Sequence, residues 1–383
     1  MPTLRVGLNL TFLTADSGGS GRYTRELIPA MLEAEADLRL TGFVSADAPA
    51  DLFSEPWADD VDWVRFRYHP TRSGPVPPLV SMAVQWAALP AIAARRRLHL
   101  LHGLANVVPV VAPRARTVVT VHDLIWLRHP QTMHARATLG MKVVTPLSAR
   151  SSDRVLAVSR AVRDDLISTL GIAPGKIDVV HHGVRRTTGV TPSAESELRR
   201  RLDLGDGLVV LCVGQIRRHK NLERLVEAIA RVADARVRLV IAGVATDHGS
   251  ELEETARRLG VLERLRLPGW VGEADLEGLY GLAACFVLPS LEEGFGLPVL
   301  EAMLREIPVA CSNTTSLPEV AGDAALLFDP RDVDAISAAV ERLLHDEGLR
   351  KELIARGIER CRRFTWEETG RTTLASYRSA LEN

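Results

Sequence analysis

Two glutamates and the residues between them form the strongest chemical signal in this sequence. Glu293 and Glu301 are separated by seven residues and follow an apolar run, Cys285–Leu288, that predicts a buried strand. Pro298 fits the first turn of a helix, where its missing N–H costs nothing. Because carboxylates accept strong charge-assisted hydrogen bonds, Glu293 in the loop can bind sugar hydroxyls and Glu301 in the helix can bind a ribose diol.

The backbone between these glutamates predicts an anion site. Gly294, Phe295, Gly296 and Leu297 lie where a glycine-containing turn enters the helix. Free amides in such a turn and the positive end of a helix both attract phosphate groups. Glutamates at this spacing can also merely cap or solvate a helix end, so it is the complete string after a buried strand that favours binding.

A basic cluster follows a second predicted strand, Leu208–Val213. Lys220 stands just before a helix pattern that begins near Leu222, and Arg217 and Arg218 lie close to it. Cations fixed at such a position stabilise the charge that develops on a diphosphate leaving group. Basic residues in a loop are also often only solvated, and either arginine is a candidate for a second charge beside Lys220.

His122 and a group of glycines are the candidates in the first half of the chain. His122 follows the predicted strand Thr117–Val121, and Asp123 is placed to orient its ring. Gly19 and Gly21 are expected between the first strand and the first helix, where glycine lets the backbone approach a ligand. Both features are also common in purely structural roles, and Thr24 occupies the place of the third glycine of a GxGxxG pattern.

Two Asp-x-Asp triplets raise the question of a metal ion that would neutralise a diphosphate. Asp60 and Asp62 stand before a short predicted strand, and Asp332 is well placed as the N-cap of a helix that contains Asp334. Neither triplet lies in a glycine-rich loop after a strand. We therefore interpret both as structural and predict no metal site.

Short apolar runs alternate with amphipathic stretches along the chain, which is typical of βαβ units and parallel sheets. The fold class predicted is α/β, with two Rossmann-like doubly wound domains that face each other across a cleft. A polar segment with glycine and proline near residues 183–193 has the composition of a linker. We expect domains at 1–185 and 186–365, and a C-terminal helix within 366–383 that packs back on the first domain.

Composition excludes several classes of protein. With 47 basic and 48 acidic residues the net charge is −1, which argues against a dedicated nucleic-acid binder. The four cysteines form no CxxC pair, and no signal sequence is evident at the N-terminus, so a cytoplasmic protein is expected. The helical pattern 80–97 ends in three arginines and is either a peripheral membrane contact at the inner face of the membrane or a core-packed helix.

The segment from Glu293 to Ala302 resembles the E-x7-E motif of glycosyltransferase family 4, whose members have the GT-B fold. Gly18–Tyr23, Val121–Leu124, Val213–Leu222 and Ser316–Ala324 resemble other segments of that family, so the resemblance covers nearly the whole chain. It is nearest the branch of mannosyltransferases that act on polysaccharides and glycolipids. The chain departs from the common pattern at Gln215, where many members carry arginine, and at His219, which takes the place of an arginine in another branch, so the residue that supplies the second charge stays open.

The resemblance implies a retaining glycosyltransferase that needs neither a metal nor another cofactor. It would move a hexose from a nucleotide diphosphate sugar to a hydroxyl of a glycan, a glycolipid or another small acceptor, with mannose from GDP-mannose as the favoured donor. The catalytic residues implied are His122, Glu293 and Lys220. The donor-binding residues implied are Gly19, Gly21, Arg217, Arg218, Gly294, Phe295, Gly296, Leu297 and Glu301.

Several alternatives stay open from the sequence. A UDP-sugar transferase would share the same fold, and a sugar-nucleotide epimerase would share the two-domain architecture but would need acid–base groups around the sugar. An NAD-dependent oxidoreductase predicts a tight GxGxxG after the first strand, which this chain lacks. A non-catalytic sensor of nucleotide sugars would bind the same ligands without transferring anything.

Overall fold

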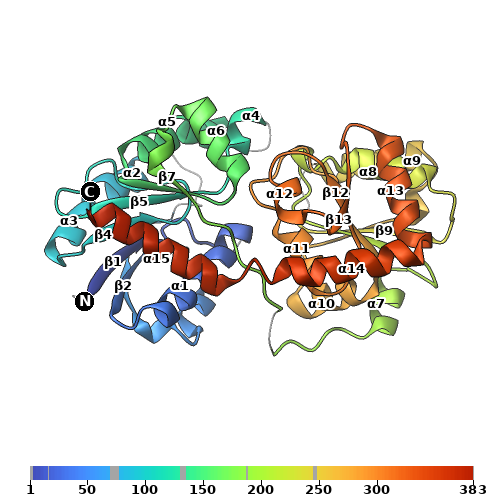
Figure 1. Ribbon diagram of the computed structural model, residues 1–383, viewed down its shortest axis with the longest axis horizontal. Helices are drawn as coiled ribbons and strands as arrows, with labels where there is room; N and C mark the ends of the chain where they lie inside the picture. Colours follow the sequence, from blue (N-terminus) through green and yellow to red (C-terminus); the bar gives the residue numbers. More distant parts are fainter. Residues whose placement is uncertain are drawn as a thin grey trace. The chain divides into compact units, whose positions relative to one another are not determined.

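The computed structural model describes residues 3–15, 17–69, 77–129, 135–186, 189–244 and 248–382 of the chain. The chain divides into two compact units, one formed by Met1–Gly183 with Trp366–Asn383 and the other by Val184–Thr365. Each unit is built around a β-sheet flanked by helices (Figure 1). Among the described residues, no helix combines the length and the apolar character that a bilayer crossing needs.

The sheet of the first unit has seven parallel strands in the order β3-β2-β1-β4-β5-β6-β7. Its central strands are buried on both faces, which explains their nearly continuous apolar sequences. The strand order reverses between β1 and β4, and parallel sheets bind ligands at such a switch point, outside the carboxyl ends of the strands. The strands are β1 (Leu4–Asn9), β2 (Leu38–Val44), β3 (Val61–Arg65), β4 (Leu100–Gly103), β5 (Arg116–Val121), β6 (Arg154–Ala157) and β7 (Ile177–Val179).

The helices of the first unit begin and end largely where local chemistry predicts. The Ser159 side chain accepts a hydrogen bond from Val162 N at the start of α6, and Gly171 ends that helix in the left-handed conformation. The helices are α1 (Gly18–Ala34), α2 (Pro77–Ala83), α3 (Leu89–Arg95), α4 (Ile125–Arg128), α5 (Ala135–Ser151), α6 (Arg160–Leu170) and α15 (Trp366–Glu382). Short helical turns are η1 (Ala50–Ser54), η2 (Ala58–Asp60), η3 (Val84–Ala88) and η5 (Pro174–Lys176).

The helical pattern predicted over 80–96 is not one regular helix. The segment η3 between α2 and α3 is a π-helix, in which Leu89 N donates to Val84 O, five residues earlier. Pro90, at the start of α3, has no N–H to donate back to the preceding turn. The wider π turn accommodates this break and keeps the chain helical across it. For this reason the apolar periodicity alone predicted one continuous helix.

The C-terminal helix α15 belongs to the core of the first unit. Trp366, Leu374, Tyr377 and Ala380 are buried in one cluster with the strands β1, β2, β4 and β5 and with α1. Figure 1 shows α15 alongside the strands and α1 of this unit, although it follows the whole second unit in sequence. The two helices come so close at Gly370 that a Cβ atom there would lie 2.8 Å from the backbone of Ala30.

The sheet of the second unit has six parallel strands in the order β10-β9-β8-β11-β12-β13. Here the order reverses between β8 and β11, so the crevice predicted by the switch-point rule lies between the loops that follow these two strands. The strands are β8 (Leu208–Val213), β9 (Val237–Ala242), β10 (Leu265–Gly269), β11 (Ala283–Leu288), β12 (Val309–Ser312) and β13 (Ala325–Phe328).

The helices of the second unit cover both faces of this sheet. Asp332 caps α13, as predicted, because its side chain accepts hydrogen bonds from the backbone of Asp334 and Ala335. The helices are α7 (Glu195–Arg201), α8 (Leu222–Arg231), α9 (His248–Arg258), α10 (Glu273–Leu282), α11 (Leu297–Leu304), α12 (Leu317–Ala321), α13 (Val333–His345) and α14 (Glu347–Cys361), with the turns η6 (Arg218–Lys220) and η7 (Leu262–Arg264).

The close approach at Gly370 predicts that Gly370→Ala destabilises the first unit by about 1–3 kcal/mol, because the methyl group forces α15 away from α1. Gly140→Ala is the matched control, since a Cβ atom on this helical glycine meets nothing within 4 Å and should stabilise α5 by roughly 0.5–1 kcal/mol. Thermal unfolding of both variants checks the prediction, and equal effects would contradict it.

Candidate active site

Lys220 and Glu293 come together at the switch point of the second sheet. Lys220 ends the turn after β8, and Glu293 lies in the loop after the neighbouring strand β11. Lys220 Nζ donates to Glu293 Oε1 over 2.6 Å, and the two side chains are only 15% and 10% exposed. Ser290 Oγ, which is fully buried, donates to the same carboxylate oxygen over 2.6 Å. The pair joins two segments that are 73 residues apart in sequence.

The electrostatics of this pair favour the ionised form of Glu293. Burial alone raises the pKa of Glu293, but the Lys220 charge, hydrogen bonds from Lys220 and Ser290, and the charge of His219 outweigh it, so the net pKa is lowered. The carboxylate is therefore ionised at neutral pH. A pair of this kind, largely withdrawn from water, holds its geometry better than an exposed salt bridge does.

The loop that carries Glu293 is held by hydroxyl groups and by a glycine. Thr315 Oγ1 accepts from Glu293 N over 3.1 Å, and Ser316 Oγ lies 2.9 Å from the carbonyl oxygens of both Glu293 and Phe295, to which it can donate. Gly296 has φ +101° and directly precedes α11, and a Cβ atom there would lie 2.6 Å from Leu317. Gly294, Phe295, Gly296 and Leu297 thus form the turn into the helix N-terminus, as predicted from the sequence.

Glu301 occupies a separate position on α11, one turn beyond the helix start. It is 5% exposed, and its Oε2 atom accepts from the buried Tyr280 hydroxyl over 2.9 Å. Arg305 lies over the Tyr280 ring at 4.5 Å and pairs with Glu277. These contacts fix the carboxylate of Glu301 on the helix, and none of them was evident from the sequence.

The structure distinguishes the two arginines beside Lys220. Arg218 donates to both carboxylate oxygens of Glu251 over 2.7 Å, and its side chain is 53% exposed. Arg217 Nε instead donates to Gln215 Oε1 over 2.8 Å, at the end of β8. Gln215 stands where members of the resembled family carry arginine, so its amide oxygen holds the guanidinium of Arg217 close to that position.

Three glycines stand at adjacent strand ends close to the pair. Gly214, Gly243 and Gly269 stand at the carboxyl ends of β8, β9 and β10, and Gly243 N donates to Gly269 O over 2.9 Å. A Cβ atom at Gly243 would lie 1.9 Å from Gly214 O, and one at Gly214 would lie 3.7 Å from Lys220 Nζ. Trp270, which is 75% exposed, follows directly.

His122 lies after β5 in the first unit, and its tautomer follows from its contacts. Its Nε2 atom lies 2.7 Å from Leu104 O, which can only accept, so a neutral ring carries its proton on Nε2. Burial lowers the pKa of His122 to about 4, against a weaker opposing effect of that hydrogen bond. The Asp123 carboxylate accepts from Ile125 N at the start of α4, and the Leu104 carbonyl fixes the Nε2 side of the His122 ring.

Gly19 and Gly21 do not lie in a loop, so that expectation was wrong. The helix α1 begins at Gly18, and Gly21 N donates to Ser17 O over 3.2 Å, which places both glycines in its first turn. The helix starts earlier than the apolar periodicity indicates because the first turn contains only small residues, which carry no periodicity. Gly19 still leaves open space, since a Cβ atom there would meet nothing within 4 Å.

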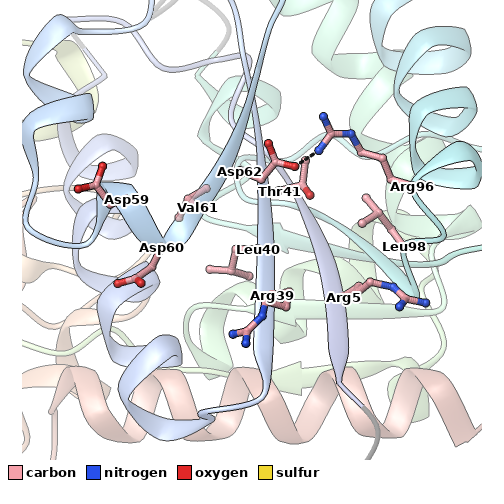
Figure 2. Close-up of a pocket in the computed structure, with 10 residues that line it drawn as sticks. All are labelled: Arg5, Arg39, Leu40, Thr41, Asp59, Asp60, Val61, Asp62, Arg96 and Leu98. Atoms are coloured by element: carbon pink, nitrogen blue, oxygen red, sulfur yellow. Dashed lines mark hydrogen bonds and ion pairs between the residues drawn. The ribbon is translucent and has the colours of Figure 1, made fainter.

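A cavity of about 440 Å³ in the first unit lies away from all of these residues. Figure 2 shows Arg5, Arg39 and Arg96 together with Asp59, Asp60 and Asp62 around it, and Arg96 is paired with Asp62. The lining comes mainly from the amino-terminal halves of β1, β2 and β3, the edge opposite to the one where parallel sheets bind ligands. Its balanced charges fit a solvated, ion-paired surface better than a phosphate site.

One group of described residues offers the side-chain types of a metal site: Glu223, His248 and Glu251. His248 Nε2 lies 2.9 Å from Glu223, and Nδ1 lies 2.7 Å from Glu251. Because the two ring nitrogens point in different directions, the carboxylates flank the ring, and one ion cannot bind the ring together with both. The group fits a hydrogen-bonded histidine better than a metal centre.

Comparison with solved structures identifies the fold. A crystal structure of Anabaena Alr3699/HepE in complex with UDP-glucose matches with a TM-score of 0.75, covering 97% of this chain and 100% of that chain at 18% identity. Two Rossmann-like units of this kind make up the GT-B fold of glycosyltransferases. The predicted α/β class with two Rossmann-like domains is thus confirmed.

Sequence comparison identifies the family. The family described as "Glycosyltransferase Family 4" matches residues 17–187, and "Glycosyl transferases group 1" matches residues 195–360. The O-antigen chain mannosyltransferase B of Escherichia coli is 33% identical over 270 residues, which are 69% of this chain and 70% of that protein. A D-inositol 3-phosphate glycosyltransferase of Salinispora tropica is 30% identical over 96% of this chain and 82% of that protein. The chain belongs to glycosyltransferase family 4 and is a glycosyltransferase.

The lowered pKa of Glu293 predicts how stability depends on pH. The stabilisation from its ionised form is fully present above its ordinary pKa of 4.5 and is lost as the pH falls through the lower folded value. Glu293→Gln should therefore cost about 3 kcal/mol at pH 7, and the difference from the wild type should narrow toward pH 3. Thermal unfolding across this range tests it, with Glu253→Gln on the exposed face of α9 as the control. A difference that does not change with pH would contradict the ion pair.

Proposed function

We propose that this glycosyltransferase retains anomeric configuration, needs no metal ion, and moves mannose from GDP-mannose to a hydroxyl of a glycan or glycolipid. The observation that carries this proposal is the Lys220–Glu293 pair at the switch point of the second sheet, beside the N-terminus of α11. An ammonium, free amides and a carboxylate are thereby gathered in a crevice of the kind that binds nucleotides in parallel α/β sheets.

In this proposal the second unit binds the nucleoside diphosphate. Lys220 and the backbone amides of residues 294–297 neutralise the phosphates, and Arg217 rather than Arg218 supplies the second charge, since Arg218 is engaged by Glu251. Glu301 accepts hydrogen bonds from the ribose diol. The open backbone at Gly269, with the exposed Trp270, offers a flat surface for the base.

Glu293 and His122 bind the transferred sugar. Because its proton is on Nε2, neutral His122 presents Nδ1 as an acceptor for a sugar hydroxyl and does not act as an acid at neutral pH. In the transfer step the bond from the sugar C1 to the leaving phosphate oxygen breaks, and the acceptor oxygen bonds C1 from the same face. The acceptor proton passes to the departing phosphate oxygen, and the cations stabilise the charge that develops there.

The choice of mannose as the transferred sugar rests on relatives of the chain. The proposed location of the protein at the membrane rests on surface features. The Escherichia coli relative is named as a mannosyltransferase, whereas a structural neighbour holds UDP-glucose, so a UDP sugar is the competing donor. For a glycolipid acceptor we propose a cytoplasmic protein in peripheral contact with the membrane. The segment from Met82 to the arginines Arg95–Arg97 supports this, because Met82 is 41% exposed and the segment ends in positive charge.

A donor screen tests the proposed function. GDP should raise the unfolding temperature more than UDP does, because a ligand that binds only the folded state stabilises it. GDP-mannose with an acceptor pool should release GDP at the same rate with and without EDTA, and the new glycosidic bond should keep the donor's anomeric configuration by NMR. A larger rise of the unfolding temperature with UDP than with GDP would instead indicate a UDP sugar as the donor. Loss of turnover in EDTA, or inversion at C1, would contradict the mechanism.

If basic side chains stabilise the charge on the leaving group, variants that remove these side chains should lower kcat to different degrees. Lys220→Met should lower kcat by about 10²–10³-fold, in the range seen when one electrostatic stabiliser is removed. Arg217→Gln should lower it less, and Arg218→Gln should stay close to the wild type because Arg218 pairs with Glu251. Steady-state kinetics with the donor identified above gives the order. A Lys220→Met enzyme with wild-type turnover, or an Arg218→Gln effect larger than that of Arg217→Gln, would overturn these assignments.

A further inference from the structure

The C-terminal helix α15 contacts the carboxyl-end region of the first sheet at three points. The Trp366 ring lies 5.9 Å from that of His182 and 6.3 Å from that of Tyr23, measured between ring centroids. Thr369 Oγ1 donates to His181 O over 2.8 Å. Three turns after Trp366, the Tyr377 hydroxyl lies 2.7 Å from His102 Nδ1. One face of this helix therefore borders the residues that surround His122.

A buried chain of hydrogen bonds runs from Tyr377 toward His122. His102 Nε2 lies 2.8 Å from Thr120 Oγ1, and Thr120 Oγ1 lies 3.1 Å from the Tyr23 hydroxyl. Tyr377, His102, Thr120 and Tyr23 are each at most 1% exposed. We call Tyr377, His102, Thr120 and Tyr23 the buried relay. It joins α15, β4, β5 and α1, four elements that the chain brings together only in the folded unit.

The direction of the relay follows from its members. Burial, and to a lesser extent the nearby His122, lowers the pKa of His102 to about 3, so the ring is neutral and has one donor and one acceptor nitrogen. Tyr377 donates to Met31 Sδ over 3.5 Å, so its oxygen can accept from His102 Nδ1–H. His102 Nε2 then accepts from Thr120, whose oxygen accepts from Tyr23. In this direction every hydroxyl has an acceptor, whereas the reverse would require a further acceptor for Tyr23.

Tyr23 connects the relay to the sugar-binding candidate. The Tyr23 ring meets the His122 ring edge to face, at 5.0 Å between centroids and an interplanar angle of 83°. It also contacts His182, which lies 5.5 Å from His122. The orientation of the Tyr23 ring therefore limits the positions open to His122, while the Leu104 carbonyl fixes its Nε2 side.

We propose that Tyr377 is a positioning residue for His122, so that the C-terminal helix helps to set the donor-sugar site of the first unit through the buried relay. The functional part of this inference rests on the proposed role of His122 in binding the transferred sugar. Without the Tyr377 hydroxyl, His102 Nδ1–H has no acceptor in the relay, and the ring can transfer its proton to Nε2. Thr120 then accepts from His102 Nε2–H and donates to Tyr23, so the hydrogen bond that orients the Tyr23 ring reverses and the Tyr23 hydroxyl loses its acceptor in the relay.

Tyr377→Phe is the direct test, because it removes the hydroxyl and keeps the ring that packs on His102 at 5.4 Å. In ¹⁵N-histidine NMR spectra of the full chain, the variant should shift the ring nitrogens of both His102 and His122. The KM for the sugar donor should rise about fivefold, the scale of one lost hydrogen bond. The affinity for the free nucleoside diphosphate, which lacks the sugar, should be unchanged.

Ser376→Ala is the matched control, since it removes a buried hydroxyl from the same helix whose bond within the described residues goes to Thr372 O. It should leave the His122 signals and the donor KM as in the wild type. Thr120→Val breaks the relay at its centre and should reproduce the Tyr377→Phe effects if that variant folds poorly. His122 signals unchanged in both relay variants, or changed equally in Ser376→Ala, would overturn the proposal. The NMR result needs no substrate, so it stands apart from a failure to find any donor turned over.

Discussion

An ammonium and a carboxylate that are largely withdrawn from water hold the candidate site of the second unit together. Lys220 and Glu293 come from loops after neighbouring strands, and their attraction fixes those loops against each other. The cost of desolvating each charge is offset only while the partner and the Ser290 hydroxyl stay in place. The hydroxyls that support the Glu293 loop and the glycine turn into α11 are arranged around this pair.

The strand order explains why this interaction arises where it does. In each sheet the order reverses once, between β1 and β4 in the first unit and between β8 and β11 in the second. The reversal sends the following helices to opposite faces and leaves the loops at the carboxyl ends free of covering chain. The charged pair of the second unit stands at that point. In the first unit, His122 follows β5, one strand beyond the reversal, and is held by backbone and by α15 through the aromatic residues around it.

The sequence predicted the parts of this account that local chemistry determines. Glu293 to Leu297 and Lys220 were recognisable because a buried strand, a turn and a helix start each leave a short-range pattern, and Asp332 as an N-cap is of the same kind. Contacts between distant segments left no such pattern: Tyr280 with Glu301, Ser316 with the Glu293 loop, and Leu104 with His122 all depend on the sheet being formed. The α1 glycines were misplaced because the first turn of this helix contains only small residues, which leave no apolar periodicity.

The lysine side chains offer the most direct measurement of the central claim. The chain has four lysines, Lys142, Lys176, Lys220 and Lys351, so ¹⁵N-lysine labelling gives few ammonium signals to assign. Titration with the nucleoside diphosphate should move the Lys220 signal as phosphate oxygens join Glu293 around the ammonium, and the other three should stay in place. A Lys220 signal that does not move while the protein becomes saturated with the nucleotide would contradict the account.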